Sequence, residues 1–403
     1  MRRRARFALG SMLLVAAGSY FLGFGVLRPL LRPYPYSDFA TFYAASRAVV
    51  NTENPYSRPA LVHSIQPEWN GWVGQYFYPP PFAAIVMRPL LHLPFDRARK
   101  VWVLIETVAV VAAGIVWATL GSANRLHWIG AALVLLPFAP LHHDLKLGSV
   151  SGILLLLFAL FLRARARGQS DRAALALAAA TGLKLVPAVV VVYLALSGER
   201  RLAGRTLLAS ALLVLLGLPW TGWQLYVAYV RDVLPQFTHG VFAWFTNQSL
   251  DAFFTRLFLP NPDTMPWIAS PLLHRVLTLL ASGIVLLSLV RSARRAEAPH
   301  IDAAWGPSLA LLAGLLVARI TWESMVVLSV PCFWLAAQAF QAGTLPRRQA
   351  VACAIAYALC ALPLPYAQQP IRAGIGLLLE SPRLYGMLIL FAAGIGQLRA
   401  RRG

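Results

Sequence analysis

Residues 34–56 read YPYSDFATFYAASRAVVNTENPY. This stretch follows the first strongly apolar segment and precedes the turn Tyr78-Pro79-Pro80-Pro81, after which the chain is almost continuously hydrophobic. Phe39, Phe42, Tyr43 and residues 45–49 recur at helical spacing. This pattern predicts a helix over residues 38–50 that lies on a membrane surface, with Asp38 at its start.

The composition indicates a polytopic membrane protein. Of the 403 residues, 58% are hydrophobic and 13% are charged, whereas soluble domains have about 25% charged residues. We therefore expect an all-α membrane protein in which residues 1–403 form a single integral-membrane domain with about 12 transmembrane helices. The apolar segments lie at about 7–27, 82–94, 101–120, 127–141, 149–163, 173–196, 202–220, 272–292, 303–318, 322–341, 348–364 and 382–398.

The net charge of +21 would indicate nucleic-acid binding in a soluble protein. Here the basic runs lie between apolar segments, where they set the orientation of the chain in the membrane. We therefore predict no nucleic-acid partner and cytoplasmic N- and C-termini. The N-terminal apolar run is long enough to be a retained first helix, and residues 28–81 and 221–271 are predicted as extracytoplasmic loops.

The middle of the chain does not fit a simple alternation of helices. Residues 173–196 have basic loops at both ends and carry Lys184 and Pro187 between them, which predicts a hairpin of two short helices with its tip near Lys184. The turn at residues 142–148 must then be external. One of the segments 82–94, 101–120 and 127–141 is therefore expected to be re-entrant or interfacial.

Asp38 has two interpretations. Ser37 and Asp38 are both suitable N-cap residues, and an acid at a helix N-terminus gains about 0.3–1 kcal/mol from the helix dipole. A carboxylate beneath aromatic side chains can also be a general base that accepts a proton from an attacking hydroxyl. The two roles are compatible.

The other candidate residues also have ordinary interpretations. Lys184 could extend to the membrane interface, or it could bind an anion in an external cavity. His142, His143 and Lys146 fit contact with phosphate better than a metal site with Asp144, because adjacent histidines point to different faces. Arg319 and Glu323 could form an ion pair at a helix end or line the pocket, and Asn247 and Gln248 could bind sugar hydroxyls. Cys332, Cys353 and Cys360 lie in apolar segments without metal-ligand spacing.

The sequence lacks a glycine-rich nucleotide loop, a Rossmann fingerprint and a His-Glu-x-x-His motif. It therefore gives no support to nucleotide-sugar, ATP or zinc chemistry. An external site without nucleotides fits a substrate that is carried on a lipid.

The chain contains, in order, the motifs Asp38-Phe39-x-x-Phe42-Tyr43-x-Ala45, Asn54-Pro55-Tyr56, Phe77-Tyr78-Pro79-Pro80, Pro89-Leu90 with Leu93-Pro94, Gly148 at the start of a leucine-rich segment, Gly182-x-Lys184-x-x-Pro187 and Asn247-Gln248-Ser249-Leu250. Together they resemble the motifs of glycosyltransferase family 87, integral-membrane mannosyltransferases of the GT-C fold that use polyprenyl-phosphate-mannose. The chain departs from the family at Gly148-Ser149, where members often have Gly-Gln. It departs again at Thr321-Trp322-Glu323-Ser324, where they have Ser-Trp-x-His.

The resemblance implies an extracytoplasmic site in a bacterial-type plasma membrane, with Asp38 as the base of an inverting transfer. It implies a polyprenyl-phosphate sugar donor, a lipid-linked or cell-envelope glycan acceptor, surrounding membrane lipids, no cofactor and no metal. We assign donor-phosphate binding to Lys184, Lys146, Arg319, His142 and His143. We assign the substrate pocket to Tyr43, Tyr78, Asn247, Gln248 and Glu323. The rival from another class is a transporter or flippase of a lipid-linked substrate, for which broken helices with buried cations are also expected.

Overall fold

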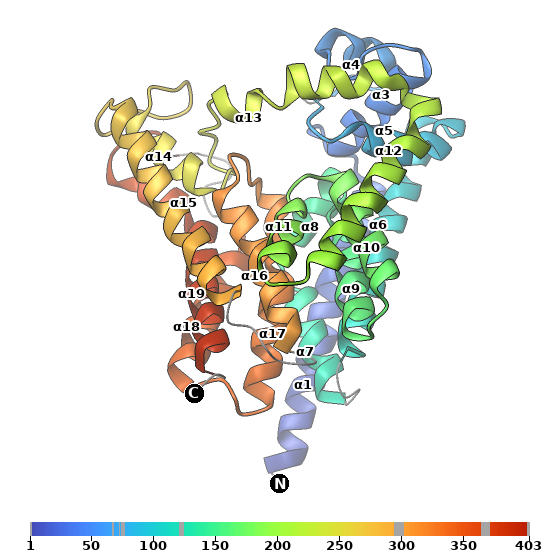
Figure 1. Cartoon of the computed structure of the whole chain (residues 1–403). Coiled ribbons are helices and arrows are strands. Elements are labelled where there is room, and N and C mark those ends of the chain that lie inside the picture. The colour runs from blue at the N-terminus through green and yellow to red at the C-terminus, as the bar shows by residue number, and fades with distance from the viewer. Residues whose placement is uncertain are drawn as a thin grey trace. The chain divides into compact units, whose positions relative to one another are not determined.

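The protein is helical in all the parts that its structure describes. The computed structural model (Figure 1) describes residues 2–66, 68–71, 73, 77–120, 125–293, 302–363 and 371–400. In these ranges no strand forms, and Asn247 and Trp322 make an isolated antiparallel bridge. The predicted all-α class is confirmed.

Contacts within the chain divide it into two compact units. Unit 1 consists of Met1–Val116, Leu141–Ala188 and Leu202–Thr238, and unit 2 of Trp117–Pro140, Val189–Arg201 and His239–Gly403. The helices that lie mainly in unit 1 are α1 (Arg2–Tyr20), η1 (Phe21–Leu27), α2 (Arg28–Leu31), α3 (Asp38–Val50), α4 (Arg58–Ile65), α5 (Pro81–Val86), η2 (Arg88–His92), α6 (Phe95–Ala118), α8 (Ala139–Leu147), α9 (Ser151–Ala166), α10 (Ser170–Leu183), α12 (Arg200–Ala228), η3 (Tyr229–Val233) and α13 (Gln236–His239).

Unit 2 has the remaining helices, and α18 and α19 lie side by side in it (Figure 1). Its helices are α7 (Arg125–Leu135), α11 (Ala188–Leu196), α14 (Leu250–Phe258), α15 (Pro271–Ala293), α16 (Asp302–Val317), η4 (Glu323–Ser329), α17 (Val330–Gln341), α18 (Arg347–Ala361), η5 (Gly374–Glu380) and α19 (Pro382–Ala400).

Five helical segments in the described ranges are long and apolar enough to cross a membrane. They are Gly10–Leu31, Phe95–Ala118, Arg200–Val233, Pro271–Ala293 and Glu323–Gln341. The pair formed by η5 and α19, bent by 54°, makes a sixth if it is one span. Several membrane helices are therefore present, and the larger number of about 12 stays a prediction.

The apolar segments at 82–94 and 127–141 do not form helices of spanning length. Residues 82–94 form α5 and η2, of 6 and 5 residues, and α7 has 11 residues, whereas a span needs about 20. Both segments are therefore short, and which segment of this region is re-entrant or interfacial stays a prediction. Helix α12 continues to Ala228, with a kink at Gly222. It therefore extends into residues 221–271, which were predicted as an extracytoplasmic loop.

Helix α3 has the predicted bounds, Asp38–Val50. Residues 39–46 are all buried, because α4, α5 and η2 pack around the helix. A helix that lies on a membrane would instead keep a polar face toward water. The helix is confirmed, and its position at the membrane surface stays a prediction.

The chain breaks at Lys184, as the hairpin prediction required. Helix α10 packs along α9 (Figure 1) and ends at Leu183, and Lys184 is extended, with φ −149° and ψ 143°. Pro187 has no N–H with which to continue the helix, and it disfavours helical geometry in the residue before it. Lys184 thus sits at the end of a short helix inside an apolar stretch.

A tight turn at Gly148 joins α8 to the start of α9. Gly148 has φ +67°, and the N–H groups of Gly148 and Ser149 donate to the carbonyls of Leu145 and Asp144 at 3.3 and 3.1 Å. This is a Schellman cap, in which glycine takes the left-handed position without steric cost. A Cβ at residue 148 would lie 2.7 Å from the Cβ of Phe39, so the missing side chain also lets α3 approach this turn.

We expect Gly148→Ala to lower the Tm of the purified protein more than Gly168→Ala does. Both glycines have φ near +70°, and alanine there costs about 1–2 kcal/mol. Only residue 148 adds a clash, since nothing lies within 4 Å of a Cβ at residue 168, and overpacking costs about 1–3 kcal/mol more. Thermal unfolding in detergent measures both variants, and equal losses of Tm would contradict the close approach of Phe39.

Candidate functional site

Asp38 is the first residue of α3, but it does not cap the helix. The hydroxyl oxygen of Ser37 accepts the N–H of Ala40 at 3.3 Å, so Ser37 is the N-cap. Ser37 also donates to the carbonyl of Leu147 at 3.2 Å, which ties the start of α3 to the end of α8. The Asp38 carboxylate is therefore available for another contact, and its side chain is only partly buried.

Ser149 joins Asp38 to Lys184. Its side chain is fully buried, and its hydroxyl lies near enough to the Asp38 carboxylate to lower the pKa of that acid. The Lys184 ammonium donates to the same hydroxyl oxygen at 3.4 Å. Residues from three separate segments thus lie together at Ser149, and they include the predicted base and the predicted cation.

Two further carboxylates lie close to Lys184. Asp144 and Glu106 are fully buried and cap the first turn of α9. Asp144 Oδ2 accepts the N–H of Ser151 at 3.3 Å, and Glu106 Oε2 accepts the N–H of Gly152 at 2.7 Å. These contacts satisfy N–H groups that have no partner within the helix. We call Asp38, Glu106, Asp144, Ser149 and Lys184 the acid–lysine cluster.

The electrostatics of the cluster favour a base with raised affinity for protons. Burial raises the pKa of Asp38 above its ordinary value, and the Lys184 charge and the Ser149 hydrogen bond oppose this rise without cancelling it. Burial likewise raises the pKa of Asp144. Within the part of the chain that the structure describes, no three His, Cys, Asp or Glu side chains are arranged to hold a metal ion.

The remaining predicted residues of unit 1 have separate surroundings. The Lys146 ammonium lies 3.7 Å from the centre of the Tyr34 ring. His142 is buried, with its ring 4.6 Å from that of Tyr20, and His143 is half-buried. The hydroxyl of Tyr43 donates to the carbonyl of Leu93 at 3.1 Å.

Tyr78 packs its ring 5.6 Å from that of Phe237, also within unit 1. Its assignment to the substrate pocket, like that of Tyr43, stays a prediction.

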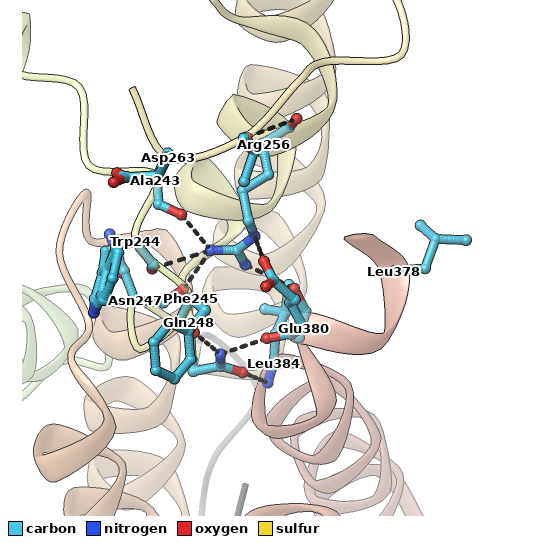
Figure 2. A network of polar contacts seen from close by, with 12 residues as sticks. Ala243, Trp244, Phe245, Asn247, Gln248, Arg256, Asp263, Leu378, Glu380 and Leu384 are labelled. Atoms are coloured by element: carbon cyan, nitrogen blue, oxygen red, sulfur yellow. Dashed lines mark hydrogen bonds and ion pairs between the residues drawn. The ribbon is translucent and has the colours of Figure 1, made fainter. Parts of the chain in front are cut away.

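Asn247 and Gln248 belong to a buried network in unit 2 (Figure 2). The Asn247 amide donates to the carbonyls of Phe242 and Arg319 at 3.0 and 2.9 Å. The Gln248 amide donates to the carbonyls of Phe245 and Glu380 at 2.6 and 2.8 Å. Both side chains are fully buried. They connect backbone segments, and their predicted contact with sugar hydroxyls stays a prediction.

Arg256 is the centre of this network, and the sequence did not single it out. Figure 2 shows its guanidinium directed at backbone carbonyls, and it donates to those of Ala243 and Asn247 at 3.1 Å each and to the Ser381 hydroxyl at 2.7 Å. The charge is fully buried, with a Glu380 oxygen 3.9 Å away. The network fixes the loop before α14 against the end of η5.

Arg319 and Glu323 each pair with a residue that sequence reasoning missed. Arg319 Nε lies 3.4 Å from Asp251 Oδ2, and Glu323 Oε1 lies 2.5 Å from Nη1 of Arg383. The Arg383 side chain is fully buried. Partners of this kind come from segments far apart in the sequence, so spacing alone could not identify them.

Glu106 could have been found from the sequence. It is an acid in the middle of a 24-residue apolar helix, α6, and such residues mark functional sites or buried pairs. Ser149 and Asp144 carried no comparable signal, because serine and aspartate are ordinary residues at the turn between two helices.

A family model described as glycosyltransferase family 87 matches residues 76–317, which is more than half of the chain. The matched range includes Tyr78, Lys146, Lys184, Asn247 and Gln248. Asp38, Arg319 and Glu323 lie outside it. No curated protein matches the chain in a sequence search.

We expect Glu323→Gln to lower the free energy of unfolding by about 3–5 kcal/mol, because it leaves a buried arginine without its charged partner. The double variant Glu323→Gln with Arg383→Met removes both charges and recovers most of the loss. Thermal unfolding of the four proteins of this cycle measures the coupling. A single variant as stable as the wild type would contradict the pairing of Glu323 with Arg383.

Proposed function

Because the chain belongs to glycosyltransferase family 87, we propose that it transfers a sugar, in particular mannose, from a polyprenyl-phosphate donor to a lipid-linked or cell-envelope glycan. The glycosyltransferase activity follows from family membership. The donor, the acceptor, the sugar and the residues that act are our proposal. The GT-C fold, an extracytoplasmic site and cytoplasmic termini belong to the same proposal.

The observation that carries the proposal is the placement of Asp38 and Lys184 on either side of Ser149. Asp38 is half-buried, and Ser37 rather than Asp38 caps the helix, so the carboxylate is left for the acceptor. The Lys184 ammonium donates to Ser149 at 3.4 Å, and its charge acts on Asp38. An acid and a cation held on one scaffold provide the two charges that a displacement at a sugar phosphate requires.

The reaction is a single displacement. Asp38 accepts the proton of the acceptor hydroxyl as that oxygen forms a bond to the anomeric carbon. The bond between that carbon and the phosphate oxygen breaks, and polyprenyl phosphate leaves with the bonding electron pair. Lys184 stabilises the negative charge of the phosphate. Attack from the face opposite the leaving group inverts the configuration at the anomeric carbon.

Ser149 and the two buried acids position these groups. The Ser149 hydroxyl lies next to Asp38 and accepts a hydrogen bond from Lys184, so it sets the position of both groups. Asp144 and Glu106 occupy the N–H groups at the start of α9, a position that would otherwise attract an anion. The donor phosphate is thereby left to Lys184.

The rival function is transport or flipping of a lipid-linked substrate. The break in the helical path at Lys184 is a feature that transporters also have. Family membership favours the glycosyltransferase, and the two functions make opposite demands on Asp38.

We expect Asp38→Asn to reduce transfer by about 10²–10⁴-fold, the range for loss of a general base. Purified protein receives labelled polyprenyl-phosphate-mannose and membrane extract, and label in glycan is counted. Asp232→Asn is the matched control, because Asp232 is half-exposed and pairs with Arg231 at 2.7 Å. Full transfer by Asp38→Asn would reject Asp38 as the base.

The pH profile of kcat/KM gives an independent test. Transfer falls on the acid side as Asp38 becomes protonated, and the midpoint lies above the ordinary aspartate value of 3.8 because burial raises this pKa. Lys184→Met removes the charge that opposes the rise, so the acid limb moves to higher pH. An acid limb that stays in place, or that moves to lower pH, would contradict the electrostatic contact between Lys184 and Asp38.

A further inference from the structure

A cavity lined by basic residues lies in unit 1, at the end of the first candidate membrane span. Its volume is about 210 Å³, and it is lined by Arg28, Pro29, Arg32, Pro33, Tyr34 and Lys146. Three of these six residues carry a positive charge, and none is an acid. The cations come from two segments that are more than a hundred residues apart, so the fold and not the local sequence brings them together.

The walls of this cavity are held by buried hydrogen bonds. The Arg99 guanidinium is buried and donates to the carbonyls of Pro29 and Leu30. Asp96 holds that guanidinium in place, with an oxygen 2.8 Å from Nη2. On the other side, the bond from Ser37 to the carbonyl of Leu147 fixes the chain after Tyr34 against the end of α8. The cavity is therefore built by the fold.

Within the described residues, no acidic side chain balances the charges in the cavity. No acid in the described ranges forms an ion pair with Arg28, Arg32 or Lys146. The Lys146 ammonium instead lies over the Tyr34 ring. Burial, and after it the Arg28 charge, lowers the pKa of Lys146. Like charges held together cost free energy, and a bound anion offsets this cost.

We propose that Arg28, Arg32 and Lys146 bind the phosphate group of a membrane lipid. Arginine and lysine together provide the forked and single donors that phosphate oxygens accept. Arg28 is in the candidate span Gly10–Leu31, and exposed apolar side chains come just before it, at Leu22, Phe24 and Leu27. A lipid bound there would place its chains along this helix and its phosphate at the cations.

The binding site goes beyond the proposed transfer reaction, which uses Lys184. It contains Lys146, which the sequence analysis had grouped with the donor site, and adds two arginines that no motif marked. If the transfer proposal holds, the lipid is one of the two substrates or a lipid of the surrounding membrane. The chemistry recognised is the same in each case, a phosphate on a lipid.

Paired lipids that differ only in the phosphate test the proposal. Purified full-length protein is titrated with phosphatidic acid and with diacylglycerol, then with polyprenyl phosphate and with polyprenol, and bound lipid is counted by native mass spectrometry. We expect tighter binding of the phosphate-bearing member of at least one pair. The pair that shows the difference identifies the lipid, and equal binding within both pairs would overturn the proposal.

Variants connect the binding to the cavity. Arg28→Ala, Arg32→Ala and Lys146→Ala are each expected to weaken binding about tenfold, as for one hydrogen bond to a charged group. Lys146→Arg keeps the charge and retains binding. Arg205→Ala is the control, because Arg205 is already paired with Asp171 at 3.0 Å. The same loss in the control as in the three variants would overturn the assignment.

Two further measurements separate the possible failures. Inorganic phosphate is expected to compete only weakly, and competition as strong as that of the lipid would show a site for free phosphate and overturn the lipid assignment. Asp38→Asn is expected to bind the lipid as the wild type does. Absence of glycosyl transfer would therefore reject the transfer proposal and not the lipid-binding proposal. Loss of lipid selectivity would reject the lipid-binding proposal and not the transfer proposal.

Discussion

The approach of α3 to the turn at Gly148 is the contact on which the acid–lysine cluster depends. With no side chain at residue 148, the backbone takes a left-handed turn beneath Phe39. The indole of Trp102 donates to the carbonyls of Gly148 and Ser149 at 3.0 Å each and holds the turn from the other side. Ser149 is thereby fixed between the start of α3 and Lys184. Its hydroxyl lies next to the Asp38 carboxylate and accepts a hydrogen bond from the Lys184 ammonium.

The acid–lysine cluster holds more acidic groups than cations, and its acids are stabilised only in part by the lysine. Lys184 is the cation among three carboxylates, and two of these also cap α9. An oxygen of Glu106 and one of Asp144 have no hydrogen-bond partner in the described ranges. Unpaired buried carboxylate oxygens are costly, and the nearby ammonium offsets part of that cost. The same arrangement holds Lys184 close to Ser149.

Local patterns in the sequence predicted the local structures. The bounds of α3 followed from apolar periodicity and capping residues, and the break at Lys184 followed from Pro187 and the neighbouring charge. The cluster itself depends on contacts between separate segments, such as Ser149 with Lys184 and Ser37 with Leu147, which are 35 and 110 residues apart and which no local spacing encodes. The sequence did not predict the backbone contacts of Gln248 for the same reason, because its amide bonds to distant backbone. The family match does not cover Asp38, so its role depends on the geometry of α3.

In the proposed reaction Asp38 accepts a proton from the acceptor, whereas Lys184 binds the phosphate of the donor. Donor affinity and transfer rate, measured separately in Asp38→Asn and Lys184→Ala with labelled polyprenyl-phosphate-mannose, test it most directly. The account predicts that Asp38→Asn binds the donor as the wild type does and fails to transfer. It predicts that Lys184→Ala binds the donor more weakly. Equal donor affinity in the two variants would contradict the account.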